Sequence, residues 1–173
     1  KRKISSNPMI KESQNKGEVI FEDIGCSSCH VSSLPLKSLK FVEPGPFNTE
    51  KSTTLSESNN NLVVDLEEYV SKLEKDKDGN YLIPLYSDLK RHDMGQMLDN
   101  ERPLQKGVPT NYWLTKKLWG FYSEPPFLHH GRSNLLVDVI EMHQGDAKIS
   151  SDAFFELSET EKVDLLEFLK SFK

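Results

Sequence analysis

The string Cys26-Ser27-Ser28-Cys29-His30 decides how this chain is built, and it holds the only two cysteines among 173 residues. Two thiols at this spacing, followed directly by a histidine, are the attachment pattern of c-type haem. Each thiol can form a thioether to one of two vinyl groups on a porphyrin edge, and the adjacent imidazole is then carried to the iron. We therefore predict one haem c, covalently bound through Cys26 and Cys29, with His30 as its proximal ligand.

Two other kinds of site use paired cysteines, and both fit this string less well. A redox dithiol does not need the following histidine, and no βαβ pattern surrounds the string. A zinc site usually needs four ligands, and the sequence offers no further cysteine. A dithiol or disulfide is the alternative that stays open beside haem c.

The composition indicates a small core that a prosthetic group completes. The hydrophobic fraction is 36%, below the roughly 45–50% that is usual for globular chains, and a porphyrin packs as a large apolar plate. Lysine and arginine number 22 against 27 aspartate and glutamate, which gives a formal charge of −5. This acidic balance argues against a nucleic-acid partner, because phosphate binding needs clustered basic side chains.

The sequence contains no run of about 18–20 apolar residues, the length that a membrane span needs. Its start, Lys1-Arg2-Lys3, is charged like that of a signal peptide, but no apolar stretch follows. We interpret the sequence as a mature, processed chain or a trimmed one. Covalent haem attachment resembles a maturation that takes place outside the bacterial cytoplasmic membrane, so we expect a periplasmic or otherwise extracytoplasmic protein.

Polarity and periodicity predict how the chain is organised. Residues 1–15 are polar and lack an apolar period, so we interpret them as an N-terminal tail. Residues 16–173 are expected to form one cytochrome c-like domain, mainly α-helical around the haem, with long loops and a small β excursion. Proline and asparagine clusters indicate a loop and β insertion over about 32–90, of which residues 32–61 are expected to be a loop. Within it, 62–86 fits either a helix or, as we favour, an antiparallel excursion.

Amphipathic patterns predict three helices. A short one ends at Gly25, just ahead of the cysteines. A second runs up to His143 and has Ser133 or Asn134 as its N-cap. A third begins at the capping box of residues 158–161. Its expected buried face consists of Val163, Leu166, Leu169 and Phe172.

An acidic turn within the insertion invites a calcium interpretation. Glu74, Asp76, Asp78 and Gly79 fall where an EF-hand loop has its positions 1, 3, 5 and 6. Position 12 is Leu85 instead of the bidentate glutamate that such a loop requires. An ordinary acidic turn is therefore the better interpretation.

The sixth coordination position of the iron has two candidates. His143 follows Val139 by four residues and Leu136 by seven, which places it on the apolar face of its expected helix. Met94 is the rival, because ligation by one histidine and one methionine is common in small cytochromes c. The residues by themselves leave both candidates open.

Four further motifs carry a family resemblance. They are, in chain order, residues 85–95, 118–120, 126–132 and 141–147. Together with the cysteine string, they resemble the C-terminal haem domain of the di-haem cytochrome c peroxidase superfamily. Within that superfamily, the best match is the branch of di-haem oxidoreductases, also called thiol oxidoreductases. The resemblance covers most of the chain, roughly residues 17–172.

The resemblance implies where the haem contacts lie. In this branch the distal ligand stands at the position of His143, which makes a bis-histidine iron with His30 and leaves Met94 in the pocket wall. The resemblance also implies that Trp119, His129 and Arg132 contribute to the haem site. If the chain is half of a di-haem enzyme, His129, His130 and Arg132 lie on an electron path or at the interdomain face. A contact with a propionate or a helix terminus is the better interpretation of Arg132.

Members of the family carry two C-x-x-C-H strings, one in each domain, whereas this sequence has one. The superfamily's peroxide chemistry occurs at the N-terminal haem, and an activity does not follow from a shared fold. We therefore expect a mono-haem cytochrome c that transfers single electrons, more an electron-transfer protein than a stand-alone peroxidase. The alternative is the electron-relay half of a di-haem peroxidase or oxidase whose catalytic haem is on another chain or a missing domain.

The expected partner is a redox protein with a basic docking face, because two haem propionates add to the negative charge of the chain. A complex with another haem subunit is a further possibility that the resemblance implies. A haem-based sensor is the weakest of the three hypotheses, because no signalling domain accompanies the haem string.

Overall fold

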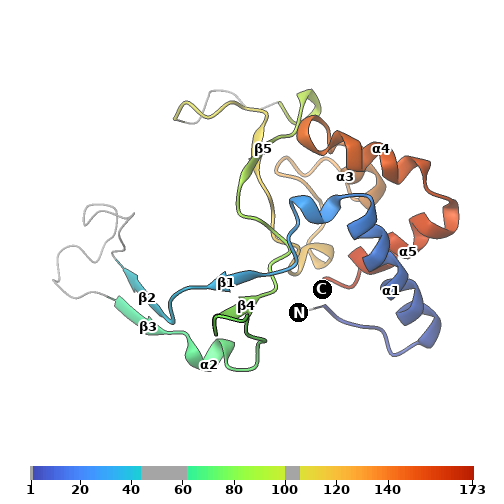
Figure 1. The fold of residues 1–173 in the computed structure, drawn as a ribbon. Coiled ribbons are helices and arrows are strands. Elements are labelled where there is room, and N and C mark those ends of the chain that lie inside the picture. The colour runs from blue at the N-terminus through green and yellow to red at the C-terminus, as the bar shows by residue number, and fades with distance from the viewer. Residues whose placement is uncertain (1, 44–61, 100–105) are drawn as a thin grey trace. The chain divides into compact units, whose positions relative to one another are not determined.

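The computed structural model describes residues 2–43, 62–99 and 106–173. Two compact units make up the chain (Figure 1): unit 1 consists of Lys1–Ser32 and Pro84–Lys173, and unit 2 of Ser33–Ile83. The cysteine string and every residue expected near the haem belong to unit 1. The expected division into a tail and one haem domain stays a prediction.

Helix α1 (Pro8–Asp23) leads into the cysteine string. It begins earlier than expected, because the side chain of Asn7 caps it and a proline occupies its first turn. About half of the segment interpreted as a tail, residues 1–15, is therefore helical. Gly25 follows the helix with a φ of 85°, a conformation that glycine adopts without strain, and turns the chain into the string.

Helix α5 (Glu159–Leu169) packs across α1. The predicted capping box at its start is confirmed. The hydroxyl of Ser158 accepts the amide hydrogen of Glu161 at 3.4 Å, and the Glu161 carboxylate accepts that of Ser158 at 2.9 Å. At the crossing, a Cβ atom added to Gly17 would overlap the main chain of Asp164. The two backbones are therefore in direct contact.

The hydrophobic core of unit 1 is built on this crossing. The rings of Phe21 and Phe168 lie 5.2 Å apart between centroids. The prediction of which residues of α5 are buried is partly wrong, because Val163 is 55% exposed, whereas Leu165 is buried. The contact with α1 selects which side of α5 is covered, and that contact is not encoded in α5 itself. The buried core residues are Phe21, Leu118, Phe127, Leu136, Phe154, Leu165, Phe168, Leu169 and Phe172.

Two shorter helices precede α5. Helix α3 (Leu136–Glu141) has Leu135 as its N-cap, so the expectation of Ser133 or Asn134 at that position is wrong. The hydroxyl of Ser133, two residues before this N-cap, instead accepts the amide hydrogen of Leu135 at 3.0 Å. Helix α4 (Lys148–Glu156) was not predicted, because its serines and aspartate are weak helix formers in isolation.

Unit 2 contains two small antiparallel sheets. Strand β1 (Leu34–Leu36) pairs with β4 (Tyr81–Ile83). Strand β2 (Lys40–Glu43) pairs with β3 (Leu62–Asp65), and the one-turn helix α2 (Glu67–Val70) follows directly.

The pairing within unit 2 differs from the expected excursion over 62–86. Strands β3 and β4 exist, but each pairs with a strand from the segment 32–61, which we expected to be a loop. Strands of three or four residues show too little alternation to be found by periodicity, and their pairing depends on distant partners. Residues 44–61 of that expected loop lie outside the described residues.

The expected fold class, mainly α, is wrong. In unit 1, β5 (Arg91–Asp93) pairs with β6 (Tyr112–Leu114). The described ranges therefore hold three two-stranded antiparallel sheets beside five α-helices. The architecture is mixed, and nothing in it strongly conflicts with a cytochrome domain. No helix in the described part of the chain is both long and apolar enough to cross a membrane.

The acidic turn of unit 2 has a structural explanation. Asp76 Oδ1 accepts the amide hydrogens of Asp78 and Asn80 at 2.9 Å each. The hydrogen bonds from Asn80 lower the pKa of Asp76. The carboxylate is thus used within the turn, and among the described residues no group of three or more His, Cys, Asp or Glu side chains is arranged to hold a metal ion.

Candidate haem site

A distant segment holds the cysteine string in place. Residues Cys26–Ser28 form one turn of 3₁₀ helix. Residues 86–88, which we term the clasp, donate their amide hydrogens to three carbonyl oxygens that follow this turn in the sequence. These belong to Ser32, Val31 and Cys29, at 3.3, 2.9 and 2.8 Å respectively. The clasp therefore fixes the path of the main chain on both sides of His30.

The clasp also orients the side chain of His30. The Nδ1–H of His30 donates to the carbonyl oxygen of Tyr86 at 2.9 Å. Burial lowers the pKa of His30 to about 4, although the hydrogen bond to Tyr86 acts in the opposite direction. At neutral pH the imidazole is therefore uncharged, which is the form that binds a metal, and Nε2 is the nitrogen left for it.

Tyr86 presents its carbonyl oxygen from a strained conformation. Its φ of 52° lies in the left-handed region, where a residue other than glycine loses about 1–3 kcal/mol. The side chain holds it there: the hydroxyl donates to Glu18 at 3.2 Å, and the ring packs edge-on against Phe172, with 4.6 Å between centroids. Burial raises the pKa of Tyr86 to about 12, so the phenol stays protonated. A cavity of about 150 Å³ lies beside Tyr86 and His30.

The ring of His143 makes the same kind of hydrogen bond as the ring of His30, from Nδ1 to a main-chain carbonyl oxygen. Helix α3 ends before it, but the amide of His143 still donates to Ile140 at 3.0 Å. Its Nδ1–H donates to the carbonyl oxygen of Val139 at 2.6 Å. Burial lowers the pKa of His143. Besides burial, His143 also acts to lower the pKa of His30.

Met94 lies beside the turn that follows His143. The amide of Met94 donates to the carbonyl oxygen of Asn111 at 2.8 Å, and its side chain is half-buried. A Cβ atom on Gly145 would stand 2.3 Å from the carbonyl oxygen of Asp93. The segment that carries Met94 and the turn after His143 are therefore in backbone contact. Whether either side chain binds iron stays a prediction.

Three residues that the resemblance placed beside the haem lie near the surface of unit 1. Trp119 is 37% exposed, and its indole N–H donates to a main-chain carbonyl oxygen. The ring of His129 stacks on that of Trp113, with 3.7 Å between centroids and 19° between planes. Arg132 is exposed, and its amide donates to His130 Nδ1 at 3.2 Å. Their roles toward a haem stay predictions.

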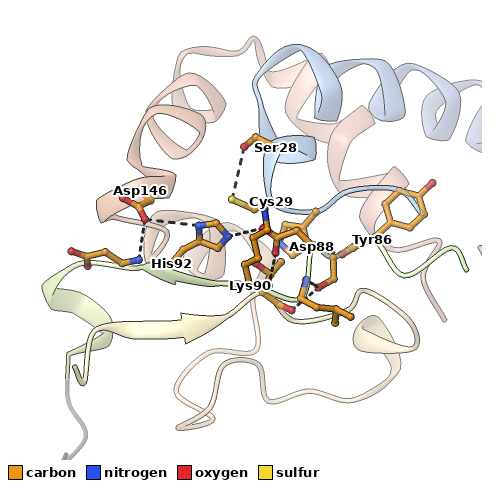
Figure 2. A network of polar contacts seen from close by, with 12 residues as sticks. Ser28, Cys29, Tyr86, Asp88, Lys90, His92 and Asp146 are labelled. Carbon is orange, nitrogen blue, oxygen red and sulfur yellow. Dashed lines mark hydrogen bonds and ion pairs between the residues drawn. The ribbon is translucent and has the colours of Figure 1, made fainter. Parts of the chain in front are cut away.

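A polar network that sequence reasoning missed joins the clasp to the turn after His143 (Figure 2). His92 Nε2 donates to Asp88 Oδ2 at 2.8 Å, and His92 Nδ1 lies 3.9 Å from Asp146 Oδ2. Burial acts to raise the pKa of Asp88, but hydrogen bonds from Lys90 and others lower it overall. The signal was present, because these residues stand in the motifs that carry the family resemblance.

The two cysteines lie in and directly after the 3₁₀ turn that precedes His30. Neither is in a disulfide, and both are partly buried. Burial raises the pKa of Cys26 to about 11. Catalytic dithiols instead depend on a lowered thiol pKa. These thiols and the two imidazoles, whose Nδ1–H groups are already hydrogen-bonded, are the residues that could hold a haem, and attachment through the thiols stays a prediction.

Comparison with known families shows to which family the chain belongs. A family model described as "Di-haem oxidoreductase, putative peroxidase" matches residues 77–172. Because the match covers more than half of the chain, this protein belongs to the di-haem oxidoreductase family, as the sequence motifs predicted. It is a haem-binding redox protein. The match begins after the cysteine string, and neither the curated proteins nor the solved structures include a match to this chain.

Proposed function

We propose that this chain binds one haem c through Cys26 and Cys29, with His30 and His143 as axial ligands, and transfers single electrons. The observation that best supports this proposal is that the two histidine rings are held by the same kind of hydrogen bond. Each ties its Nδ1–H to a main-chain carbonyl oxygen, at 2.9 and 2.6 Å, which leaves Nε2 for a metal. Metal-binding histidines almost always have such an outer hydrogen bond, because it fixes the tautomer and the direction of the ring.

The residues present fit the haem that the family implies. Both imidazoles have lowered pKa values through burial, so no proton competes for Nε2 at neutral pH. A bound haem c supplies a one-electron couple at its iron, whose potential depends on axial ligands, burial and nearby charge. The chain orients the ligands, and the rings of Phe21 and Tyr86 lie beside His30 and shield it from water. Two protein ligands also occupy the positions that oxygen or peroxide would need, which favours electron transfer.

The family match favours a second candidate function. Its description names two haems and a peroxidase, whereas the sequence has one C-x-x-C-H string. In this candidate the chain is the electron-relay half of a di-haem peroxidase or oxidase, and the catalytic haem lies on another chain or domain. The same two histidines would bind the relay iron.

Location and partner follow from the same proposal. Thioether attachment implies maturation outside the cytoplasmic membrane, so we propose a periplasmic or otherwise extracytoplasmic site of action. The formal charge of −5, made more negative by two propionates, favours a redox partner with a basic docking face.

Spectra of the mature protein and two variants test the ligand pair. We expect His143→Ala to open the iron, with a high-spin spectrum and binding of carbon monoxide, because an axial nitrogen is lost. Met94→Ala should stay six-coordinate. If Met94→Ala is the variant that opens the iron, or if the native protein shows a sulfur-to-iron band, the ligand assignment is wrong.

Two further measurements test the cofactor and separate the candidate functions. Mass spectrometry of the mature chain should show the addition of one haem, and an unmodified mass would overturn the proposal. Peroxide added to the isolated chain should neither change the spectrum nor be consumed. Peroxide consumption that appears only with a second haem protein would favour the relay function.

A further inference from the structure

The imidazole of His92 lies between carboxylates from two separate segments. Asp88 belongs to the clasp, and Asp146 stands three residues after His143. The ring reaches Asp88 Oδ2 with Nε2 at 2.8 Å and approaches Asp146 Oδ2 with Nδ1 at 3.9 Å (Figure 2). The His92 side chain is 22% exposed and that of Asp88 is 8% exposed. This end of the bridge is thus largely shielded from water.

On one side, the bridge is anchored to the haem string. The amide of Asp88 donates to the carbonyl oxygen of Cys29 at 2.8 Å. Asp88 Oδ1 accepts the amide hydrogen of Lys90 at 2.9 Å, which leaves Oδ2 to His92. The carboxylate is therefore held at both oxygens, and the imidazole that binds it is held relative to the segment that orients His30.

On the other side, the bridge meets the turn after His143. Asp146 Oδ2, the atom that His92 approaches, also accepts the amide hydrogen of Asp93 at 3.1 Å. A Cβ atom on Gly95 would stand 2.7 Å from the Gln144 side chain and 3.0 Å from the amide nitrogen of Gly145. The strand that carries His92 and the turn after His143 are thus packed backbone against backbone.

His143 follows the end of α3, which is also held from α4, because the hydroxyl of Ser151 donates to the carbonyl oxygen of Ile140 at 2.7 Å. The side-chain hydrogen bond of His143 goes to Val139 in its own helix, and helix α3 has only six residues. A bond within the helix fixes the direction of the ring relative to α3, but it does not set the distance from His143 to the opposite face of a haem. The contacts of His92, Asp93 and Gly145 link that helix end to the clasp.

From this geometry we infer that His92 is a positioning residue. It holds the turn after His143 at a fixed distance from the clasp, so that the two proposed ligands, His30 and His143, would both stay within reach of the same iron. The inference rests on the proposed bis-histidine ligation and adds to it the residue that keeps the distal ligand bound.

The test is binding of carbon monoxide to the reduced mature protein, together with its reduction potential. We expect His92→Ala to raise the fraction of iron open to carbon monoxide roughly tenfold, equivalent to about 1.4 kcal/mol, and to shift the potential. His92→Gln should return both toward wild type, because its amide can donate to Asp88. Arg91→Ala, an exposed neighbour on the same strand, is the control and should behave as wild type.

The outcomes separate this inference from the proposed function. If His143→Ala opens the iron but His92→Ala binds carbon monoxide no better than wild type, the positioning role is wrong and the ligand pair stands. If His143→Ala leaves the iron closed, the ligand pair itself is wrong. Should His92→Ala fail to mature, Asp146→Asn and Asp88→Asn give the same readout. A wild-type response in both would overturn the inference.

Discussion

Gly17 of α1 and Asp164 of α5 are in backbone contact: a Cβ atom on Gly17 would stand 2.0 Å from the Asp164 carbonyl oxygen. Replacing glycine with alanine within a helix ordinarily stabilises it by about 1 kcal/mol. Here we expect Gly17→Ala to lower the free energy of unfolding instead, by about 1–3 kcal/mol, because the added methyl group forces the helices apart. Urea unfolding followed by circular dichroism measures the change.

Asn15→Ala is the matched control for Gly17→Ala. Asn15 is exposed on the same helix, so the substitution should leave the stability unchanged or raise it slightly through helix propensity. Equal stabilities for the two variants would mean that α1 and α5 do not cross at Gly17.

A second prediction concerns Gly145. Its φ is 56° and an added Cβ atom would meet Asp93. Gly145→Ala should therefore destabilise unit 1 and loosen the turn after His143, with some high-spin iron in the visible spectrum. Gly120→Ala is the control: its φ of 65° is similar, but no atom lies within 4 Å of the added Cβ position. We expect Gly120→Ala to lower the free energy of unfolding only by the cost of a left-handed alanine, about 1–2 kcal/mol, and to leave the spectrum unchanged. A spectral change in both variants would argue against a specific role for the turn.

The third prediction concerns the stability of the fold in acid. Hydrogen bonds lower the pKa of Asp88 below its ordinary 3.8. A carboxyl group whose pKa is lower in the folded than in the unfolded state stabilises the fold above the unfolded pKa, and this contribution is lost as the pH falls through the folded pKa. We therefore expect Asp88→Asn to flatten the decline of the urea midpoint below about pH 4. Asp152→Asn, on the surface of α4, should keep the wild-type decline, and equal curves for all three proteins would contradict the prediction.

The fourth prediction concerns docking. If the negative charge of the chain steers a basic partner, the second-order rate of electron transfer should fall as ionic strength rises, since the Debye length shortens to about 10 Å at 0.1 M salt. Stopped-flow mixing over a range of salt concentrations measures this rate. A rate that does not depend on salt would indicate apolar docking.

Local signals made part of this structure predictable. The capping box at Ser158 and Glu161 could be found because both residues lie within four positions and satisfy each other's amides. The cysteine string and its histidine are likewise contiguous. The motifs around Met94 and His143 are also contiguous, and both lie within the residues that the family model matches.

Contacts between distant segments account for what the sequence did not predict. Strands β5 and β6 are three residues long, and each is defined by the other. The bridge from Asp88 through His92 to Asp146 joins segments more than fifty positions apart. The strained φ of Tyr86 is compensated by Glu18 and by aromatic rings from both ends of the chain. Periodicity within one segment contains no information about such partners.

Strand β1 pairs with β4, with Leu34 opposite Ile83, so unit 2 leaves and rejoins the chain through a stem closed by its own hydrogen bonds. In unit 1 the amide of Tyr86 donates to Ser32, so the two ends that receive the stem are already joined. We therefore expect the chain between β1 and β4 to be replaceable without a change at the cysteine string. In an engineered minimal domain, a tight hairpin in its place should leave the hydrogen bonds between the clasp and residues 29–32 unchanged.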